Sequence, residues 1–361
     1  MNNYREVELL PIKSVGASGT ETIDINVDEP VTSLDVYFRA TNGAAVADTV
    51  PPEGCIDKIE IVDGGKVYWS TSGPQAVAAA VYETGKWPAG NNDERANNGQ
   101  YILIPLLFGR YIGDEEFAFS PTKLLNPQIK VTWTRNALHT AAGYTLGIRV
   151  KTMQGVTSAS RALMVKSVRS WTSAGAGIDG TDLPVDLDIR KLYIGLWKTM
   201  RLWSEMLTHL KMDCDVGKLI MFDITSARFV DMMKDFFPPV GHHATICMDD
   251  GVWKESFLGN LLGTAVNSGS PGYFANAWSA FASRYQQWSQ TDAGVAAADV
   301  ASTLYVEGYL PWTVLCYPFG RQQEPDTWFK ASRYGQVKLE LTQGEAAVPF
   351  SILLQCPTPL P

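Results

Sequence analysis

The stretch that decides the fold reads Ile56-Asp-Lys-Ile-Glu-Ile-Val-Asp-Gly-Gly-Lys-Val67, and a related stretch, Leu207-Thr-His-Leu-Lys-Met-Asp-Cys-Asp-Val-Gly-Lys-Leu219, occurs in the second half of the chain. Each contains an apolar run that alternates with polar residues, a turn with Gly-Lys, and the start of a second apolar run. Alternation with period two is typical of a strand that has one face on a core. Both stretches therefore predict a β-hairpin, and each is followed by a short predicted helix, at Gln75–Glu83 and Ser226–Asp235.

Three further blocks recur in the same order in both halves of the chain. The paired blocks are Ile104–Arg110 with Leu315–Arg321, which share Phe-Gly-Arg outright, Gln128–Thr134 with Gln336–Thr342, and Tyr144–Val150 with Val348–Leu354. One such block would carry little weight, because period-two strands are common. Four collinear blocks indicate an internal duplication. The second copy is longer, because residues 239–302 stand where the first half has only about 88–100.

Two copies of an antiparallel unit of roughly eight strands predict an all-β fold of two sandwiches side by side. We place the first at 1–157 and the second at 158–361, with an inserted region at about 239–302 in the second. The link, Thr157–Arg161, is short, so the units should be rigidly apposed. A longer helix is predicted at Ala275–Gln290, where aromatic residues follow steps of three, four and three: Trp278, Phe281, Tyr285 and Trp288.

Composition and charge disfavour several classes of protein. The 361 residues are 45% hydrophobic and only 19% charged, which suits a protein whose surface is largely covered by neighbours. The net charge is −8 and neither terminus has a run of Lys or Arg, which disfavours direct nucleic-acid binding. The cysteines are odd in number and lack C-x-x-C spacing, which argues against a disulfide framework or zinc knuckle: Cys55, Cys214, Cys247, Cys316 and Cys356. The N-terminal residues include Arg5, Glu6 and Glu8 where a signal peptide needs an apolar stretch.

With this duplication, the sequence resembles the double jelly-roll major capsid proteins of tailless icosahedral viruses, the PRD1-adenovirus-like lineage. The features that carry the resemblance are the tandem repeat, the hairpin Ile61-Val-Asp-Gly-Gly-Lys-Val-Tyr-Trp69 before a short Ala-rich helix, and the Phe-Gly-Arg turn before a Lys-containing strand. A long insertion in one unit alone also fits. The resemblance covers nearly the whole chain and is one of architecture and pattern.

The resemblance implies a structural role. Three copies would form a pseudo-hexagonal homotrimer, and neighbouring trimers would tile an icosahedral virion shell synthesised in the host cytoplasm. Other capsid proteins, such as penton and minor proteins, and an internal membrane would be its further partners, with no sequence-specific contact to nucleic acid. The insertion at 239–302 would project outward or clasp a neighbour, and Tyr4–Ile12 would point inward or clasp adjacent trimers.

Few residues suggest chemistry, and we predict no catalytic residues, no metal ligands and no cofactor. The nearest approach to a metal site is His242-His243 with Cys247 and Asp249-Asp250, but adjacent histidines on a strand point to opposite faces, so incidental loop residues are favoured. Asp114-Glu115-Glu116 and Asp249-Asp250 are candidate paired carboxylates for glycoside hydrolysis, yet they sit beside turn residues and read as solvated loops. No Ser/His/Asp set or phosphate-binding Gly-Lys-Ser/Thr motif is present.

Two further features have a structural and a functional interpretation. The aromatic stripe at 275–290 is read mainly as packing onto the sandwich or a neighbour, with receptor sugars as the alternative ligand. Arg110 and Arg321 are equivalent under the repeat, and local salt bridges are favoured over matched pairing between subunits.

The sequence thus predicts a self-assembling capsid protein rather than an enzyme. One alternative is a two-domain carbohydrate-binding or carbohydrate-active protein, which would need a cleft with exposed aromatics. The other is a viral receptor-binding spike, but a spike has no need of two equivalent units.

Overall fold

The computed structural model describes residues 4–43, 51–93, 95, 97–141, 143–156, 159–198, 201–247, 253–255, 257–268, 278–281, 284–286 and 301–361. Side chains are described for the same residues except 246–247, 253–255, 263–268, 278–281, 284–286 and 301–304.

The first half of the chain folds as a sandwich of two four-stranded sheets. One sheet has the order β1-β9-β3-β7, and the other has the order β2-β8-β4-β5. The strands are β1 (Tyr4–Val15), β2 (Gly19–Asp24), β3 (Val31–Thr41), β4 (Ile56–Asp63), β5 (Lys66–Thr71), β7 (Gly99–Leu107), β8 (Pro127–Trp133) and β9 (Tyr144–Met153). All the pairings among them are antiparallel.

The second half repeats this arrangement strand for strand. Its sheets have the orders β10-β23-β12-β21 and β11-β22-β13-β14, so β10 takes the place of β1, β11 of β2, and so on to β23 for β9. The strands are β10 (Arg161–Thr172), β11 (Gly177–Asp182), β12 (Lys191–Leu196), β13 (Leu207–Cys214), β14 (Leu219–Thr225), β21 (Val314–Pro318), β22 (Val337–Gln343) and β23 (Pro349–Pro359). All four predicted repeat blocks fall on equivalent strands, and the prediction of two tandem jelly rolls is confirmed.

The predicted hairpins and helices form for local reasons. In the first unit only Gly64 and Gly65 separate β4 from β5, and Gly64 has φ of 57°, a value that glycine adopts without a steric penalty. Helix α1 (Gly73–Thr84) follows β5, and its first turn is closed by a capping box in which the Ser72 and Gln75 side chains bond each other's backbone N–H. Helix α3 (Ser226–Lys234) occupies the same position after β14, with Thr225 as its N-cap.

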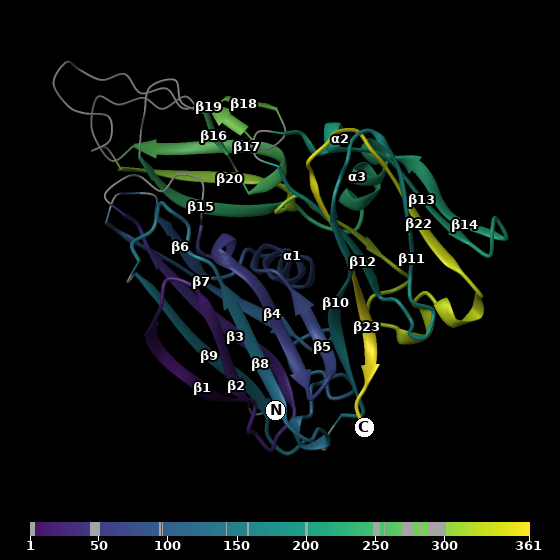
Figure 1. Cartoon of the computed structure of the whole chain (residues 1–361), viewed down its shortest axis with the longest axis horizontal. Helices are drawn as coiled ribbons and strands as arrows, with labels where there is room; N and C mark the ends of the chain where they lie inside the picture. Colours follow the sequence, from purple (N-terminus) through teal and green to yellow (C-terminus); the bar gives the residue numbers. More distant parts are fainter. Residues whose placement is uncertain are drawn as a thin grey trace.

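The two jelly rolls are joined by sheets that continue from one unit into the other. Strand β5 lies parallel to β10 through the pair Ser70–Lys166. The short β6 (Gly90–Asp93) pairs with β7 on one side and lies parallel to β15 (Val240–Cys247) on the other. A single cluster of buried apolar side chains runs from Ile23 in the first unit to Leu360 in the second. The units are therefore packed as one body, with α1 between them (Figure 1).

The inserted part of the second unit, which has no counterpart in the first, adds strands to the sheet that contains β7 and β6. Strands β17 (Leu258–Ser268) and β20 (Ala301–Pro311) continue the sheet from β15, and β16 (Trp253–Glu255), β18 (Trp278–Phe281) and β19 (Arg284–Gln286) form a small separate sheet. The helix predicted at Ala275–Gln290 is wrong where the structure describes it, because Trp278–Phe281 and Arg284–Gln286 pair as antiparallel strands. The spacing of the aromatic residues favoured a helix, but aromatic residues as a type are enriched in strands. The rest of that range, including Trp288, lies outside the described residues.

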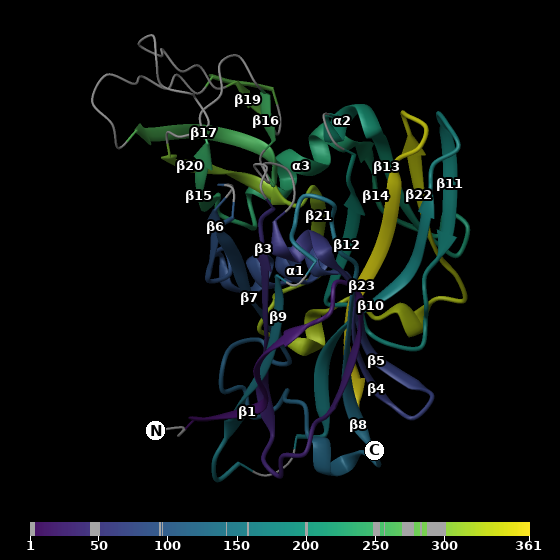
Figure 2. The same cartoon turned by 60° about the vertical axis from the view of Figure 1, so that its left-hand side comes forward.

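The molecule has two distinct ends. Both chain termini lie at one end, and the β15–β20 region lies at the opposite end in both views (Figure 1, Figure 2). Among the described residues, no helix has the length and apolarity needed to span a membrane.

Candidate functional site at the junction of the two jelly rolls

A buried cluster of charges joins α1 of the first jelly roll to β12 of the second. Glu83, near the end of α1, accepts from Arg190 Nη1 at 2.6 Å and from Lys191 Nζ at 2.5 Å. Lys191 Nζ also donates to the carbonyl oxygen of Tyr82 at 3.0 Å, close to the negative end of the α1 dipole. The three charged side chains are at most 5% exposed, so this is the most deeply buried ionic contact between the two units described in the structure.

Burial and pairing act in opposite directions on this cluster. Burial alone would raise the pKa of Glu83, but Lys191 and Arg190 outweigh it and hold that pKa below its usual range. Burial lowers the pKa of Lys191, and Glu83 opposes the shift only in part. Glu83 therefore remains ionised, and it is the group on which both cations depend.

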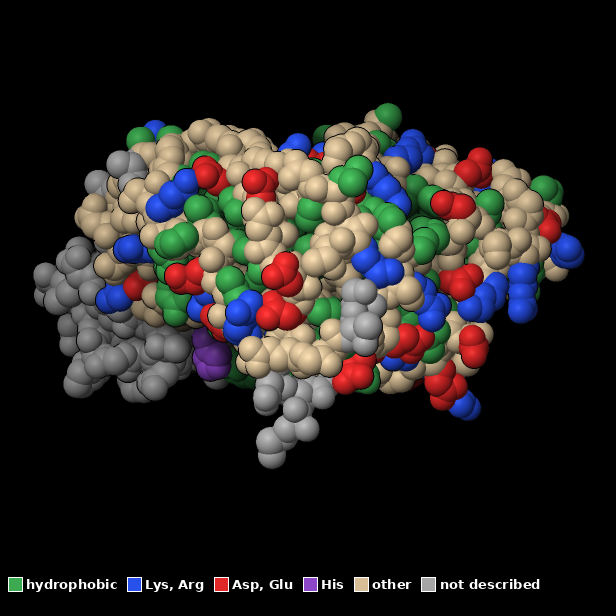
Figure 3. All heavy atoms as spheres, turned by 90° about the horizontal axis from the view of Figure 1, so that it is seen from below, with side chains coloured by type: hydrophobic (Ala, Val, Ile, Leu, Met, Phe, Trp, Pro, Cys, Tyr) green, Lys and Arg blue, Asp and Glu red, His purple; other side chains and the backbone are tan. Residues whose placement is uncertain are grey.

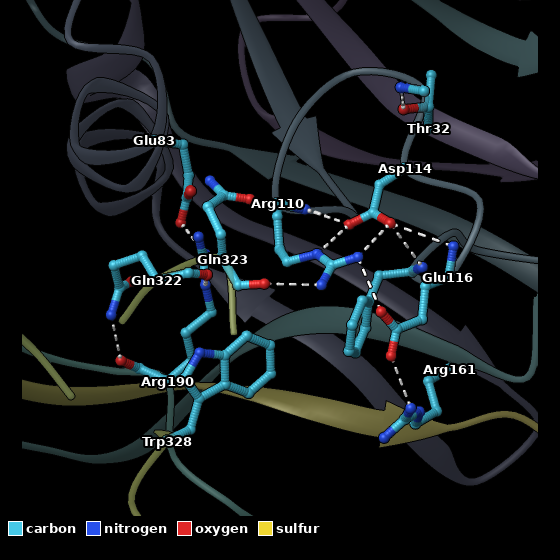
Figure 4. Close-up of polar contacts among 12 residues, drawn as sticks. Thr32, Glu83, Arg110, Asp114, Glu116, Arg161, Arg190, Gln322, Gln323 and Trp328 are labelled. Atoms are coloured by element: carbon cyan, nitrogen blue, oxygen red, sulfur yellow. Dashed lines mark hydrogen bonds and ion pairs between the residues drawn. The ribbon is translucent and has the colours of Figure 1, made fainter. Parts of the chain in front are cut away.

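A second network surrounds Arg110 in the turn after β7 (Figure 4). Arg110 Nε donates to Asp114 at 2.7 Å, Nη2 reaches Glu116 at 2.8 Å, and Nη1 donates to the carbonyl oxygen of Gln323 in the second jelly roll at 2.9 Å. Glu116 also pairs with Arg161 at the start of β10. The turn thus bonds the first unit to the loop of the second that carries its own Phe-Gly-Arg.

Within this network, Asp114 holds the backbone of the turn in place. Asp114 is buried and accepts from the backbone N–H groups of Arg110 and Glu116. Burial would raise its pKa, but the hydrogen bonds from Arg110 prevail and lower it, which is the opposite of what a general acid needs.

Arg110 and Arg321 both make the predicted local salt bridges. Arg321, at the equivalent position, pairs with Glu324 at 3.1 Å, but its side chain is 77% exposed and it bonds to none of the described residues of the first unit. The alternative, in which both arginines pair across subunits, stays a prediction.

A second buried acid also connects the two units. Glu53 lies in the short η1 helix (Pro52–Cys55), is 3% exposed, and accepts from the indole N–H of Trp312 at 3.3 Å. Trp312 stacks on Phe257 at 4.6 Å and contacts Trp197 at 5.1 Å, edge on. Burial raises the pKa of Glu53 from 4.5 to about 7, because no described cation pairs with it.

The two histidines that came nearest to a metal site in the sequence make aromatic contacts. His242 on β15 contacts Trp87 with the two rings tilted and their centroids 4.6 Å apart, and burial lowers the pKa of His242 to about 4. His243 contacts Tyr305 on β20 at 4.7 Å. The Cys247 side chain, Asp249 and Asp250 lie outside the described residues, and the described residues hold no group of three or more side chains suited to a metal ion.

The remaining four cysteines are buried and free. Burial raises the pKa of the thiol of Cys55 to about 11 and that of Cys356 to about 12, and it also raises those of Cys214 and Cys316. Burial thus leaves these thiols unprepared for reaction, and the Cys55 sulfur lies 3.4 Å from His139 Nδ1 and 3.9 Å from the Tyr144 hydroxyl.

Sequence reasoning missed the residues that join the two units. Glu83 closes an Ala-rich helix and Arg190-Lys191 opens an apolar strand, so each looks like a solvated end of an element. The one available signal was the long apolar run that follows directly after the two basic residues, Leu192–Trp197.

Comparison with solved structures finds the same double jelly roll in viral capsids. The chain is similar to the major capsid protein of Sulfolobus turreted icosahedral virus, with a TM-score of 0.59 and 9% identity over 99% of this chain and 97% of that one. It is also similar to the major capsid protein of bacteriophage PM2, with a TM-score of 0.56 and 9% identity over 99% and 98%. It is similar as well to a chain of the PBCV-1 virus capsid, with a TM-score of 0.57 and 11% identity over 99% of this chain and 94% of that one. Neither a family model nor a curated protein matches the sequence.

Proposed function

We propose that this chain is a viral major capsid protein that self-assembles as homotrimers and then as an icosahedral shell. The observation that carries the proposal is the end-to-end likeness to capsid proteins, in which both jelly rolls and their connection are matched over 99% of the chain. The role is structural, and its driving force would be burial of apolar surface between copies, at about 25 cal/mol per Å² of apolar area.

The duplication gives a geometric reason for a trimer. Two jelly rolls with the same strand order present two similar outlines, so three copies around one axis would give a nearly sixfold outline that packs in a plane. For this assembly we place the first jelly roll at 1–157, the second at 158–361, and the outward-facing insertion at about 239–302. The end with the termini would face inward.

The inward face of such a shell need not hold the genome directly. Seen from the end with the termini, acidic and basic side chains are intermingled among apolar patches (Figure 3). A mixed surface favours contact with other proteins over a dense array of phosphates. We therefore propose other capsid proteins, or an internal membrane, as the partners beneath the shell, with assembly in the host cytoplasm.

The first test is the mass of the purified chain in solution by size-exclusion chromatography with light scattering. Three copies of 39.6 kDa predict about 119 kDa, with hexagonal outlines or shells by negative-stain microscopy. A monomer that fails to assemble under any ionic condition would contradict the proposal and favour a glycan-binding protein, which glycan arrays would then test. A trimer that never tiles would favour the receptor-binding spike.

Surface variants sharpen this test, because each jelly roll exposes a large apolar side chain. Leu125, just before β8, is 98% exposed and Ile178 on β11 is 72% exposed. If these side chains are buried between copies, Leu125→Asp and Ile178→Asp should fold normally and at least one should assemble less. The matched control is Thr22→Asp on β2, the strand equivalent to β11. If all three variants assemble equally poorly, the added negative charge itself, and not the loss of an apolar contact, would explain the effect.

A further inference from the structure

A cavity of about 350 Å³ lies at the junction of the two jelly rolls, beside the buried charge cluster. Its walls come from the end of α1, the start of β12, α3 with the turn after it, and the end of β20. The wall therefore combines Glu83, Arg190 and Lys191 with apolar side chains such as Val230 and Phe237. The volume falls in the range of small-ligand sites.

The two cations have more N–H donors than the described protein has acceptors for them. Arg190 has five N–H groups; Nε donates to the carbonyl oxygen of Gln322 at 3.2 Å, and Nη1 donates to Glu83 and to Gln355 at 2.7 Å. Among the described residues, none accepts from its Nη2. Lys191 uses two of its three donors, on Glu83 and on the Tyr82 carbonyl oxygen. Both side chains are 2% exposed and both line the cavity.

Donors that face a cavity are satisfied by water or by the acceptors of a ligand, and hydrogen bonds between charged groups are the stronger ones. The cluster also has two cations for one carboxylate, so an anion would complement its charge. In the same wall, Gln322 Oε1 is buried and has no donor among the described residues, so the O–H group of a protonated phosphate would satisfy it. The apolar part of the lining would contact any hydrocarbon attached to the anionic group.

We propose that this cavity binds the oxyanion group of a small ligand, a carboxylate or a phosphate, with Arg190 Nη2 and Lys191 Nζ as its donors. The ligand would lie between the two jelly rolls and would stabilise their contact by binding the folded protein alone. The site belongs to one chain, so it does not depend on the capsid role and is tested separately from assembly.

The experiment is isothermal titration of the full chain with three probes: octanoate, 1-octanol and inorganic phosphate. Octanoate and octanol share a hydrocarbon tail and differ in the charged group, and phosphate has the charge without the tail. We expect octanoate to bind about tenfold or more tightly than octanol, because hydrogen bonds to charged groups are the strong ones. Phosphate should compete with octanoate. Tighter binding of octanoate than phosphate identifies an amphiphile as the source, and the reverse identifies a free anion.

Matched variants locate the site. Lys191→Met removes one donor at similar length and should weaken octanoate about tenfold, whereas Lys13→Met, which breaks an exposed pair with Glu21, should leave binding unchanged. Circular dichroism checks that both are folded. If Lys191→Met fails to fold, competition between phosphate and octanoate on the unaltered protein still decides the question. Equal affinity for octanol and octanoate, or no binding of octanoate and phosphate, would overturn the proposal. The donors of Arg190 and Lys191 would then bind water instead.

Discussion

At the scale of single residues, the two buried acids at the junction have opposite surroundings. Glu83 is held between two cations, whereas Glu53 faces the indole N–H of Trp312 and no described cation. A carboxylate in the first setting is stable only while it is charged, and one in the second setting is stable mainly while it is neutral. The two acids should therefore respond in different ways to pH and to removal of their charge.

Glu53 should make stability fall as the pH rises. Its folded pKa of about 7 lies above the ordinary 4.5, so its contribution is fully present below pH 4.5 and is lost as the pH rises through 7. That shift corresponds to about 3 kcal/mol. Glu53→Gln should raise the melting temperature at pH 8 and flatten its dependence on pH between 5 and 8. The exposed Glu115→Gln is the control, and an unchanged pH profile for Glu53→Gln would contradict this assignment.

Glu83→Gln should be strongly destabilising. The change leaves Arg190 and Lys191 buried with no carboxylate, and breaking a buried ion pair in this way costs about 3–5 kcal/mol. Urea unfolding followed by tryptophan fluorescence would measure the loss. Glu324→Gln, which breaks the exposed pair with Arg321, should cost at most about 1 kcal/mol. Similar losses in both variants would show that burial of the first pair has no energetic weight.

At the scale of elements, the sequence predicted what local pattern controls. The hairpins, α1, α3 and the strands of the repeat depend on period two, turn glycines and caps, and all of them formed as expected. The parallel contacts of β5 with β10 and of β6 with β15 join segments with no pattern in common. The pairing of Glu83 with Arg190 spans 107 residues, and no local signal reports it. At 275–290 the aromatic spacing wrongly predicted a helix, because aromatic residues also favour strands.

The start of α1 offers a test of how tightly this element is packed. A Cβ on Gly73 would overlap the backbone carbonyl oxygen of Glu53 and the side chain of Ile56. Gly73→Ala should therefore destabilise the protein by about 1–3 kcal/mol, although alanine favours a helix more than glycine does. Gly177→Ala on β11, where a Cβ meets no atom within 4 Å, is the matched control. Calorimetry on both variants would show the contrast, and a stabilised Gly73→Ala would refute it.

At the scale of the whole molecule, the two jelly rolls share sheets, a core and buried charges. We expect them to unfold together, in a single calorimetric transition that coincides with the change in tryptophan fluorescence. One continuous cluster of buried apolar side chains, from Ile23 to Leu360, runs through both units. Two separate transitions, or a stable fragment of one unit after limited proteolysis, would show that the link is weaker than this packing implies.

The four buried thiols have a consequence of their own. A maleimide or disulfide reagent needs an accessible thiolate, which the folded chain withholds at Cys55, Cys214, Cys316 and Cys356. Each modification event at these positions then records a moment at which the interior was open to solvent. Because Cys55 belongs to the first jelly roll and the other three to the second, mass spectrometry of the modified peptides would follow the opening of each half separately.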